Sequence, residues 1–485
     1  MFVHNIKIIF IAILSMATYY DTVIIGAGFT GLYSAYELLK SYPEMSIGIF
    51  EKGSRVGGRI MTEQVQGHIQ EYGPMRFEPE LQPNFSKLLK ELCIPTKIFT
   101  PYTSPCKDPN FNDIWFEEVQ AIVRDRSLAP PFAILKHAFK KILDEQWDVE
   151  NDDIHDMYRD EKKEWLKRYG TFQGQYIHMM GIWDILAHVL SKPALDYVVY
   201  NGTFYHMIAV NPNAADVICF ILDIIATCKF HLITIDGGSN TLIEKLHKNV
   251  AKHVDMKLDH NLETFLEFDE NIELKFRNGE VTSCKRLILT CQQSGMQTIY
   301  GFDDDIKHYL NSVILVKLFK LFIVIENPPW DEDTIPSPNF NADKLPCREI
   351  HYYYNKTNET GMVMLYGDVP TLNYWKSFVP LDADYVPLHN DNSHLKNHVN
   401  HYLRIMFPHH RHFNIIDYCL MDWSSEPHET GCHFWKPKFV SSEIIEKLSQ
   451  FGKNNNIHIC GETYSNYQGF IEGCVRTAKK VLSKI

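Results

Sequence analysis

The chain has 485 residues, of which 45% are hydrophobic and 22% are charged, as in a globular protein with two or three domains and a large core. The formal net charge of −12 argues against nucleic acid as a partner, because phosphate binding needs a basic surface. The eleven cysteines include no C-x-x-C pair and no regular spacing with histidine, which argues against a metal site or a disulfide framework.

The N-terminal residues allow two interpretations. Lys7 precedes a short apolar run over residues 8–14, and Ser15 and Ala17 are small, a pattern typical of a secretory signal peptide. The run is too short to cross a bilayer, so we expect no membrane span. A translation start at Met16 would instead give a cytoplasmic protein, and the sequence leaves both localisations open.

Residues 20–51 have the pattern of a nucleotide-binding βαβ unit. A strand over 20–25 runs into a glycine turn, a helix is expected over 31–40, and a second strand over 47–50 ends in Glu51. Glu51 can accept hydrogen bonds from an adenosine ribose. In the turn, the first glycine permits the sharp bend, the second lets a pyrophosphate approach, and the third lets the helix pack on the strand. These three glycines are Gly26, Gly28 and Gly31.

A second glycine pair follows the acid directly. After Lys52 comes the segment Arg55-Val56-Gly57-Gly58-Arg59. Adjacent glycines again permit close approach of the backbone to a ligand. The planar guanidinium of Arg59 can pair with a phosphate, so this segment is predicted to extend the nucleotide site.

The middle of the chain is predicted to contain a helical region followed by two sets of strands. Residues 131–227 show helical periodicity, and a strand over 232–235 then leads into a Gly-Gly turn and a helix over 241–250. Further strands are expected over 272–276 and 286–290. One long strand (313–325) and two shorter ones (350–354 and 361–366) indicate a second, mixed sheet.

The C-terminal segment completes the nucleotide pattern. A strand over 457–460 ends in Gly461-Glu462, and Gly469-Phe470 opens the last helix. Together with the G-G-R segment, this resembles the FAD enzymes related to the monoamine oxidases. The resemblance covers almost the whole chain and implies an α/β fold with a split Rossmann-type FAD-binding domain, a mixed-sheet substrate domain and a helical insertion.

The resemblance also implies domain bounds and a set of cofactor contacts. The FAD-binding domain is expected over 18–65, 232–297 and 438–485, the substrate-binding domain over 66–125 and 298–437, and the helical domain over 126–231. The expected FAD contacts are Gly26, Gly28, Gly31, Glu51, Lys52, Gly58, Arg59, Gly73, Met75, Arg76, Glu462, Gly469 and Phe470.

Within this superfamily, Gly73-Pro74-Met75-Arg76 resembles a segment of the L-amino-acid oxidases, in which the arginine holds the substrate carboxylate. A guanidinium suits that role because it forms two parallel charge-assisted bonds to a carboxylate. Tyr366, in Leu365-Tyr366-Gly367, is similar to the family's phenol on the same carboxylate. By the same resemblance the Gly469 carbonyl would accept from the substrate amine, while Phe470 and Trp435 would line the pocket.

Lys320 is the predicted catalytic lysine, because it precedes Trp330 by the ten residues typical of the family. Such a lysine would bind a water and assist O2 reduction by stabilising negative charge. Lys317 competes for this assignment, and a structural lysine is the other interpretation. Cys432 lies near the position that carries covalent flavin in monoamine oxidases, without the surrounding pattern.

The predicted reaction is oxidative deamination of an L-amino acid. Arg76 and Tyr366 would hold the carboxylate while hydride passes to FAD, giving a 2-oxo acid, ammonia and hydrogen peroxide. An amine or polyamine oxidase of the same fold is the first alternative. A flavin-binding protein that has lost turnover and a flavoprotein desaturase are weaker ones. The partners are then the small-molecule substrate and O2, and a homodimer is expected by analogy alone.

Overall fold

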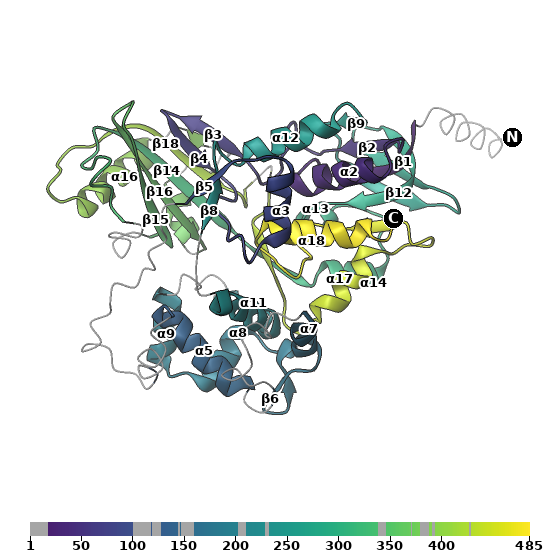
Figure 1. Cartoon of the computed structure of the whole chain (residues 1–485), viewed down its shortest axis with the longest axis horizontal. Helices are drawn as coiled ribbons and strands as arrows, with labels where there is room; N and C mark the ends of the chain where they lie inside the picture. Colours follow the sequence, from purple (N-terminus) through teal and green to yellow (C-terminus); the bar gives the residue numbers. More distant parts are fainter. Residues whose placement is uncertain are drawn as a thin grey trace.

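The computed structural model describes residues 18–99, 118, 128–143, 146, 160–201, 210–227, 232–337, 346–369, 371–378, 388–389, 393–425 and 428–485. The candidate signal peptide over 1–17 lies outside these ranges. Figure 1 shows a sheet flanked by helices on the right, a second sheet on the left and a helical group below. The mixed α/β class expected from the sequence is confirmed.

The first sheet is built around the predicted βαβ unit. Strand β1 (Thr18–Ile25) pairs in parallel with β2 (Ile47–Phe50) on one side and with β12 (Val281–Leu289) on the other. The described strands run in the order β10-β11-β12-β1-β2-β9, with β20 beside β12. The remaining members are β9 (Val254–Lys257), β10 (Leu262–Glu267), β11 (Ile272–Phe276) and β20 (Ile457–Ile459).

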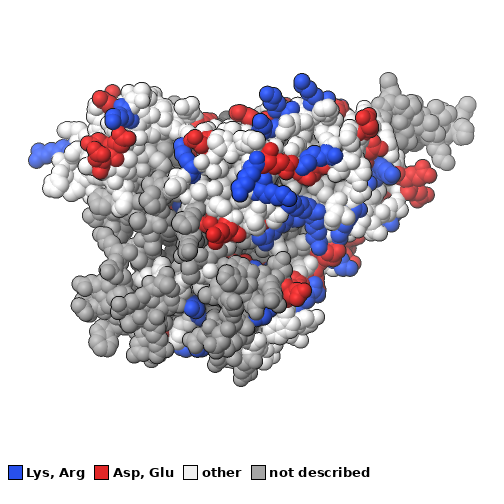
Figure 2. Space-filling view, in the orientation of Figure 1, with Lys and Arg blue, Asp and Glu red and all other residues white. Residues whose placement is uncertain are grey.

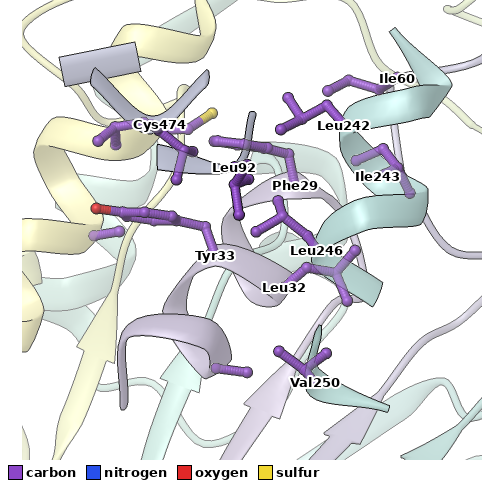
Figure 3. Packing of buried hydrophobic residues seen from close by; sticks show 14 of the residues in the cluster. Phe29, Leu32, Tyr33, Ile60, Leu92, Leu242, Ile243, Leu246, Val250 and Cys474 are labelled. Atoms are coloured by element: carbon purple, nitrogen blue, oxygen red, sulfur yellow. The ribbon is translucent and has the colours of Figure 1, made fainter. Parts of the chain in front are cut away.

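Helix α2 (Phe29–Ser41) lies between two partners that come from distant parts of the chain. These are α12 (Asn240–Val250) and α18 (Ile471–Leu482). Figure 3 shows Phe29 and Leu32 of α2 meeting Leu242 and Leu246 of α12 in one buried apolar cluster. Burial of these side chains contributes roughly 1.5–3 kcal/mol each. The packing of α2 against its neighbours therefore fixes the position of the glycine turn at its start.

The second sheet is apolar on one face, and its other face combines apolar side chains with Lys320. Its described strands run β15-β16-β14-β18-β17, and they comprise β14 (Leu318–Glu326), β15 (Glu349–Asn355), β16 (Thr360–Asp368), β17 (Leu388–His389) and β18 (Asn414–Asp422). The odd-numbered residues of β14 are apolar and buried together with side chains of α15 (Thr371–Lys376) and α16 (Ser393–Met406). The opposite face carries Lys320, because successive side chains of a strand alternate between faces.

The helical group packs around its own core. It consists of α5 (Pro130–Leu143), α7 (Asp160–Tyr169), α8 (Ile182–Val189), α9 (Lys192–Asn201) and α11 (Ala214–Thr227). Phe139, Ile185 and Ile218 are among the fully buried side chains of this cluster. Near α7 and α8 lie β6 (Thr171–Phe172), β7 (Gln175–Tyr176) and the 3-10 turn Ile177–Met179.

Short strand pairs and further helices complete the described structure. The pairs are β3 (Thr62–Val65) with β4 (His68–Glu71), β5 (Thr96–Ile98) with β8 (Ile233–Ile235), and β13 (Val313–Val316) with β19 (Cys432–Trp435). The further helices contribute to the cores beside the first sheet, and they are α3 (Pro83–Glu91), α13 (Gln293–Gln297), α14 (Asp304–Leu310) and α17 (Ser441–Ser449).

Two expected strands differ from the structure. The strand near 232–235 forms as β8, but it pairs with β5 outside the first sheet. The long strand over 313–325 is interrupted at Lys317, which is exposed. The part before Lys317 pairs with β19 and the part after it pairs with β16 and β18, so one apolar run supplies two separate sheets. The domain bounds given above stay a prediction.

The described surface in Figure 2 carries basic and acidic side chains side by side. Lys40, for example, pairs with Glu37 and Glu91, and Lys484 pairs with Glu446. Among the described helices, none is long and apolar enough to cross a membrane.

Candidate functional site

The glycine turn after β1 has the contacts that its motif requires. Gly26 has φ +106°, a conformation that favours glycine. A Cβ on Gly31 would lie 1.9 Å from the Gly26 carbonyl oxygen, so only glycine lets α2 approach the strand this closely. Gly28 begins the helix without a side-chain cap, and the first turn of α2 contains no acid. The positive end of the helix dipole is thus available to an anion.

Glu51 and the second glycine pair close around this turn. One Glu51 oxygen accepts from the Ala27 amide and the other from the Gly53 amide, each at 2.8 Å. A carboxylate accepts about four hydrogen bonds, so Glu51 retains capacity for ribose hydroxyls. Gly28 and Gly57 form a parallel bridge, and a Cβ on Gly28 would lie 3.6 Å from Gly58 Cα. Lys52 is exposed beside them.

The side chain of Arg59 forms an ion pair with that of Glu462. Arg59 Nη1 donates to Glu462 Oε2 at 2.7 Å, and His433 Nδ1 donates to the same oxygen at 3.0 Å. The backbone amides of His433 and Gly469 bond the other oxygen at 3.0 and 2.8 Å. Burial alone would raise the pKa of Glu462, but Arg59 and His433 hold the pKa well below its usual range. Glu462 is therefore a permanent anion that fixes three chain segments.

These features fit FAD. Close packing at Gly31 and between Gly28 and Gly58 removes side chains from the turn that a pyrophosphate would approach. The uncapped end of α2 supplies amides to phosphate, and Glu51 supplies an acceptor to ribose. Glu462 stands at the end of β20, beside the start of α18.

Lys320 lies under the segment that follows β4. Its Nζ donates to the carbonyl oxygens of Glu71 and Gly73 at 2.6 and 2.5 Å. An ammonium has three donors, so one remains for a water or a ligand within the described surroundings. Burial lowers the pKa of Lys320 to about 7, although the nearby Glu71 favours the charged form. The competing Lys317 is exposed, so Lys320 is the lysine that the fold buries.

A row of polar side chains crosses the second sheet at Lys320. The strand register aligns Glu349 of β15, Tyr366 of β16 and Lys320 of β14 as direct neighbours. Lys320 Nζ lies 5.7 Å from the centre of the Tyr366 ring, and the Arg348 guanidinium lies 4.6 Å from the same ring. Burial raises the pKa of Tyr366 to about 12, so the phenol stays a neutral donor.

Arg76 reaches this row and pairs with Glu349. Its Nη2 lies 2.9 and 2.8 Å from the two Glu349 oxygens. The Arg348 Nη2 lies 3.3 Å from Glu349, and His351 Nε2 lies 3.2 Å from it. Burial opposes ionisation of Glu349, but Arg76, His351 and Arg348 hold its pKa well below the usual range. Arg76 thus already holds a carboxylate, one that belongs to the protein.

The segment that carries Arg76 is tightly held. A Cβ on Gly73 would lie 1.9 Å from the Arg59 carbonyl oxygen, so the two predicted motifs pack against each other. Trp423 donates its indole N–H to the Tyr72 carbonyl at 2.8 Å. Met75 is buried in the apolar cluster that contains Trp423. After Arg76, Phe77 exchanges two backbone hydrogen bonds of 2.9 Å with Ile233, so the chain is held on both sides of Arg76.

The predicted pocket residues near the last helix lie in two different environments. Gly469 has φ +83° and open space around its Cα, and Phe470 packs 5.8 Å from Phe220 and 5.2 Å from Tyr467, ring centre to ring centre. Trp435 lies in the core of the first sheet and donates to the Ser465 carbonyl. Its neighbour Phe434 points to the opposite face of β19 and packs against the helical core.

Cys432 is partly buried close to Glu462. Burial and the nearby Glu462 raise the pKa of the thiol above its usual range, which disfavours the reactive thiolate. The interpretation as a covalent attachment point stays a prediction.

Sequence reasoning missed Glu349, Arg348 and His433 as members of the site. Glu349 and His351 are alternate residues in a strand whose other face is buried and apolar. That alternation signals a polar face, which the sequence could have revealed. His433 shares the buried face of β19 with Trp435, and its partner Glu462 follows 29 residues later, so only the fold unites them.

Comparisons with known proteins agree with this geometry. A family model described as flavin-containing amine oxidoreductase matches residues 29–481. An L-amino-acid oxidase of Crotalus adamanteus is 22% identical over 376 residues, which cover 73% of this chain and 67% of that protein. Coproporphyrinogen III oxidase of Staphylococcus aureus is 47% identical over 51 residues, which span 10% of this chain and 11% of that protein.

Among solved structures, a redesigned double mutant of putrescine oxidase matches with a TM-score of 0.68 and 16% identity, covering 96% of this chain and 99% of the other. Wild-type putrescine oxidase bound to putrescine matches with a TM-score of 0.68 and 15% identity, covering 96% and 98%. Likeness at this identity shows the fold alone. Since the family model spans nearly the whole chain, this protein belongs to the flavin-containing amine oxidoreductases, and its cofactor is FAD.

Proposed function

We propose that this protein oxidises the C–N bond of a small-molecule amine, with O2 as the electron acceptor. When bound, FAD accepts a hydride equivalent from the carbon next to nitrogen, and O2 takes the electrons as hydrogen peroxide. The observation that carries the proposal is the row Glu349–Tyr366–Lys320, which meets the segment after β4 at the Gly73 carbonyl.

The residues of this row have distinct roles. The remaining N–H of Lys320 would hold a water, and its positive charge would stabilise the negative charge that develops on O2. The Tyr366 hydroxyl would orient the substrate as a neutral donor. Gly469, whose amide is fixed by Glu462, would present its carbonyl to the substrate nitrogen, with Phe470 as an apolar wall.

Two substrate classes compete at this site. L-Amino acids are favoured by the 22% identity with L-amino-acid oxidases and by the Gly73-Pro74-Met75-Arg76 segment. In that case Arg76 and Tyr366 would hold the substrate carboxylate. Amines without a carboxylate are favoured by the ion pair between Arg76 and Glu349. Because this pair neutralises the arginine, the charge of the site supports the second class better.

The test is peroxide release by the purified yellow protein with a panel of substrates. The panel comprises the proteinogenic L-amino acids, their D-isomers, benzylamine, putrescine and spermine. Peroxide from any of these amines supports amine oxidation, and the pattern across the panel separates the two classes. Bound flavin with no turnover of any amine would contradict the proposal.

A further inference from the structure

Arg76 and Arg348 both point at one buried carboxylate. The Glu349 side chain is 1% exposed, while that of Arg76 is 17% exposed and that of Arg348 is 10% exposed. Both oxygens of Glu349 lie within 2.9 Å of Arg76 Nη2. Arg76 is therefore the more open member of a pair whose acid is fully enclosed.

The enclosed acid already pairs with one end of the Arg76 guanidinium, at Nη2. Arginine recognises a carboxylate through the planar fork of its guanidinium. Here both carboxylate oxygens of Glu349 contact the Nη2 nitrogen of Arg76. A ligand carboxylate at Arg76 would stand next to the ionised Glu349. Two carboxylates that share one site repel each other, and burial increases this repulsion.

The charges around the pair are balanced without a ligand. Arg76 and Arg348 face Glu349, and the Arg348 Nη1 also lies 3.8 Å from Asp368 Oδ2. His351, on the same strand, donates to Glu349 and is held neutral because burial lowers its pKa. Across the row, Lys320 stands beside Glu71, whose backbone carbonyl it contacts. A further anion at this place would upset the balance between cations and carboxylates.

We propose that Glu349 determines specificity by keeping Arg76 occupied, so that the site selects amines that lack a carboxylate near the reacting carbon. This inference rests on the proposed amine oxidation. Glu349 is enclosed by Arg76, Arg348 and His351, so it acts on the substrate through Arg76 and is a positioning residue.

The two substrates for the test differ only by a carboxylate, and the two binding probes carry opposite charges. L-Phenylalanine and phenethylamine serve as substrates. Benzoate and benzylamine serve as binding probes, measured by calorimetry without O2 on protein whose FAD has first been reduced, so that benzylamine is not oxidised. In the wild type we expect phenethylamine to have a kcat/KM at least about tenfold above that of L-phenylalanine, and benzoate to bind more weakly than benzylamine.

Glu349→Gln removes the charge and keeps the size of the side chain. We expect this variant to raise the kcat/KM of L-phenylalanine relative to phenethylamine by about tenfold or more, because Arg76 regains an unneutralised charge. For the same reason the affinity for benzoate relative to benzylamine should rise by about tenfold or more. The double variant that combines Glu349→Gln with Arg76→Gln should lose the gain toward L-phenylalanine and benzoate. Glu326→Gln is the matched control, since Glu326 lies exposed at the end of β14 and bonds Asn414. It should leave both ratios unchanged.

The outcomes separate this inference from the proposed function. An unchanged benzoate-to-benzylamine ratio in Glu349→Gln, or a wild type that prefers L-phenylalanine, would overturn the specificity role. Absence of turnover would count against amine oxidation, while the binding ratios would still decide the role of Glu349. If Glu349→Gln does not fold, the wild type decides the role of Glu349 through two preferences. These are phenethylamine over L-phenylalanine in kcat/KM and benzylamine over benzoate in binding.

Discussion

Arg59 and Glu462 are separated by 403 positions in the chain, yet Nη1 of the arginine lies 2.7 Å from Oε2 of the glutamate. The arginine ends the G-G-R segment after the βαβ unit, and the glutamate follows strand β20. Arg59 Nη1 also donates to the Gly431 carbonyl at 2.8 Å. The ion pair therefore joins both predicted flavin motifs to the turn that leads into β19.

Replacing Glu462 by Gln should reduce FAD content. The variant leaves Arg59 and His433 facing an uncharged amide, and breaking a buried ion pair costs about 3–5 kcal/mol. We expect less flavin per protein in the visible absorption spectrum and a lower melting temperature. Glu446→Gln is the control, because Glu446 is exposed and pairs with Lys480 and Lys484 at the surface. Equal flavin content in the two variants would contradict the role of Glu462.

Gly31→Ala should separate helix α2 from strand β1. The added methyl group would lie 1.9 Å from the Gly26 carbonyl oxygen, so the backbone must move, at a cost of roughly 1–3 kcal/mol. We expect weaker FAD binding and a lower melting temperature. Gly295→Ala provides the comparison, since that Cβ would meet Cys291 Cβ at 3.3 Å within helix α13. A FAD affinity for Gly31→Ala equal to that of the wild type would exclude this packing as the reason for the glycine.

Lys320→Met should slow the reaction of the reduced protein with O2. The protonated lysine stabilises developing negative charge, so the rate should rise as the pH falls through about 7. In the variant the rate should drop by roughly a hundredfold and lose this dependence on pH. The measurement is stopped-flow reoxidation across pH 6 to 9. An inflection near pH 7 that persists in the variant would assign it to another group.

The same variant gives a stability test with a defined sign. Because the pKa of Lys320 is lowered to about 7 in the folded protein, the unfolded chain binds more protons above that pH. The unfolding free energy of the wild type should therefore rise between pH 7 and 10 relative to Lys320→Met, by up to ~1.4 kcal/mol per pH unit. Parallel curves for the two proteins would show that the lysine is not destabilised by burial.

FAD should be released intact when the protein is denatured in acid. Burial raises the pKa of the Cys432 thiol, and a thiol that does not ionise is a poor nucleophile. We expect all flavin in the supernatant after acid precipitation, both for the wild type and for Cys432→Ser. Flavin that stays in the pellet with the wild type, and not with Cys432→Ser, would establish covalent attachment.

Much of the fold was predictable because its signals are local. The glycine turn, the helix after it and the strand that ends in Glu51 lie within about thirty residues, and each has its own pattern. The strand at 272–276 has the predicted bounds. The split at Lys317 was not predictable, because both halves of the run are apolar and only their pairing partners differ.

The candidate site was predictable in its members and not in its contacts. The resemblance to the amine oxidase family indicated Lys320, Arg76 and Tyr366 one by one. Their relation depends on the register of β14, β15 and β16, and a shift of one residue would turn every side chain to the other face. Glu349 carries no motif, and its effect on Arg76 appears only when these strands are paired.

Anaerobic mixing of the FAD-loaded protein with substrate tests the central claim most directly. Loss of the oxidised flavin absorbance on adding benzylamine, putrescine or phenethylamine, followed by its return with peroxide on admitting O2, is the result that we predict. Flavin that stays oxidised with every amine and every L-amino acid would contradict the assignment of this protein as an amine oxidase.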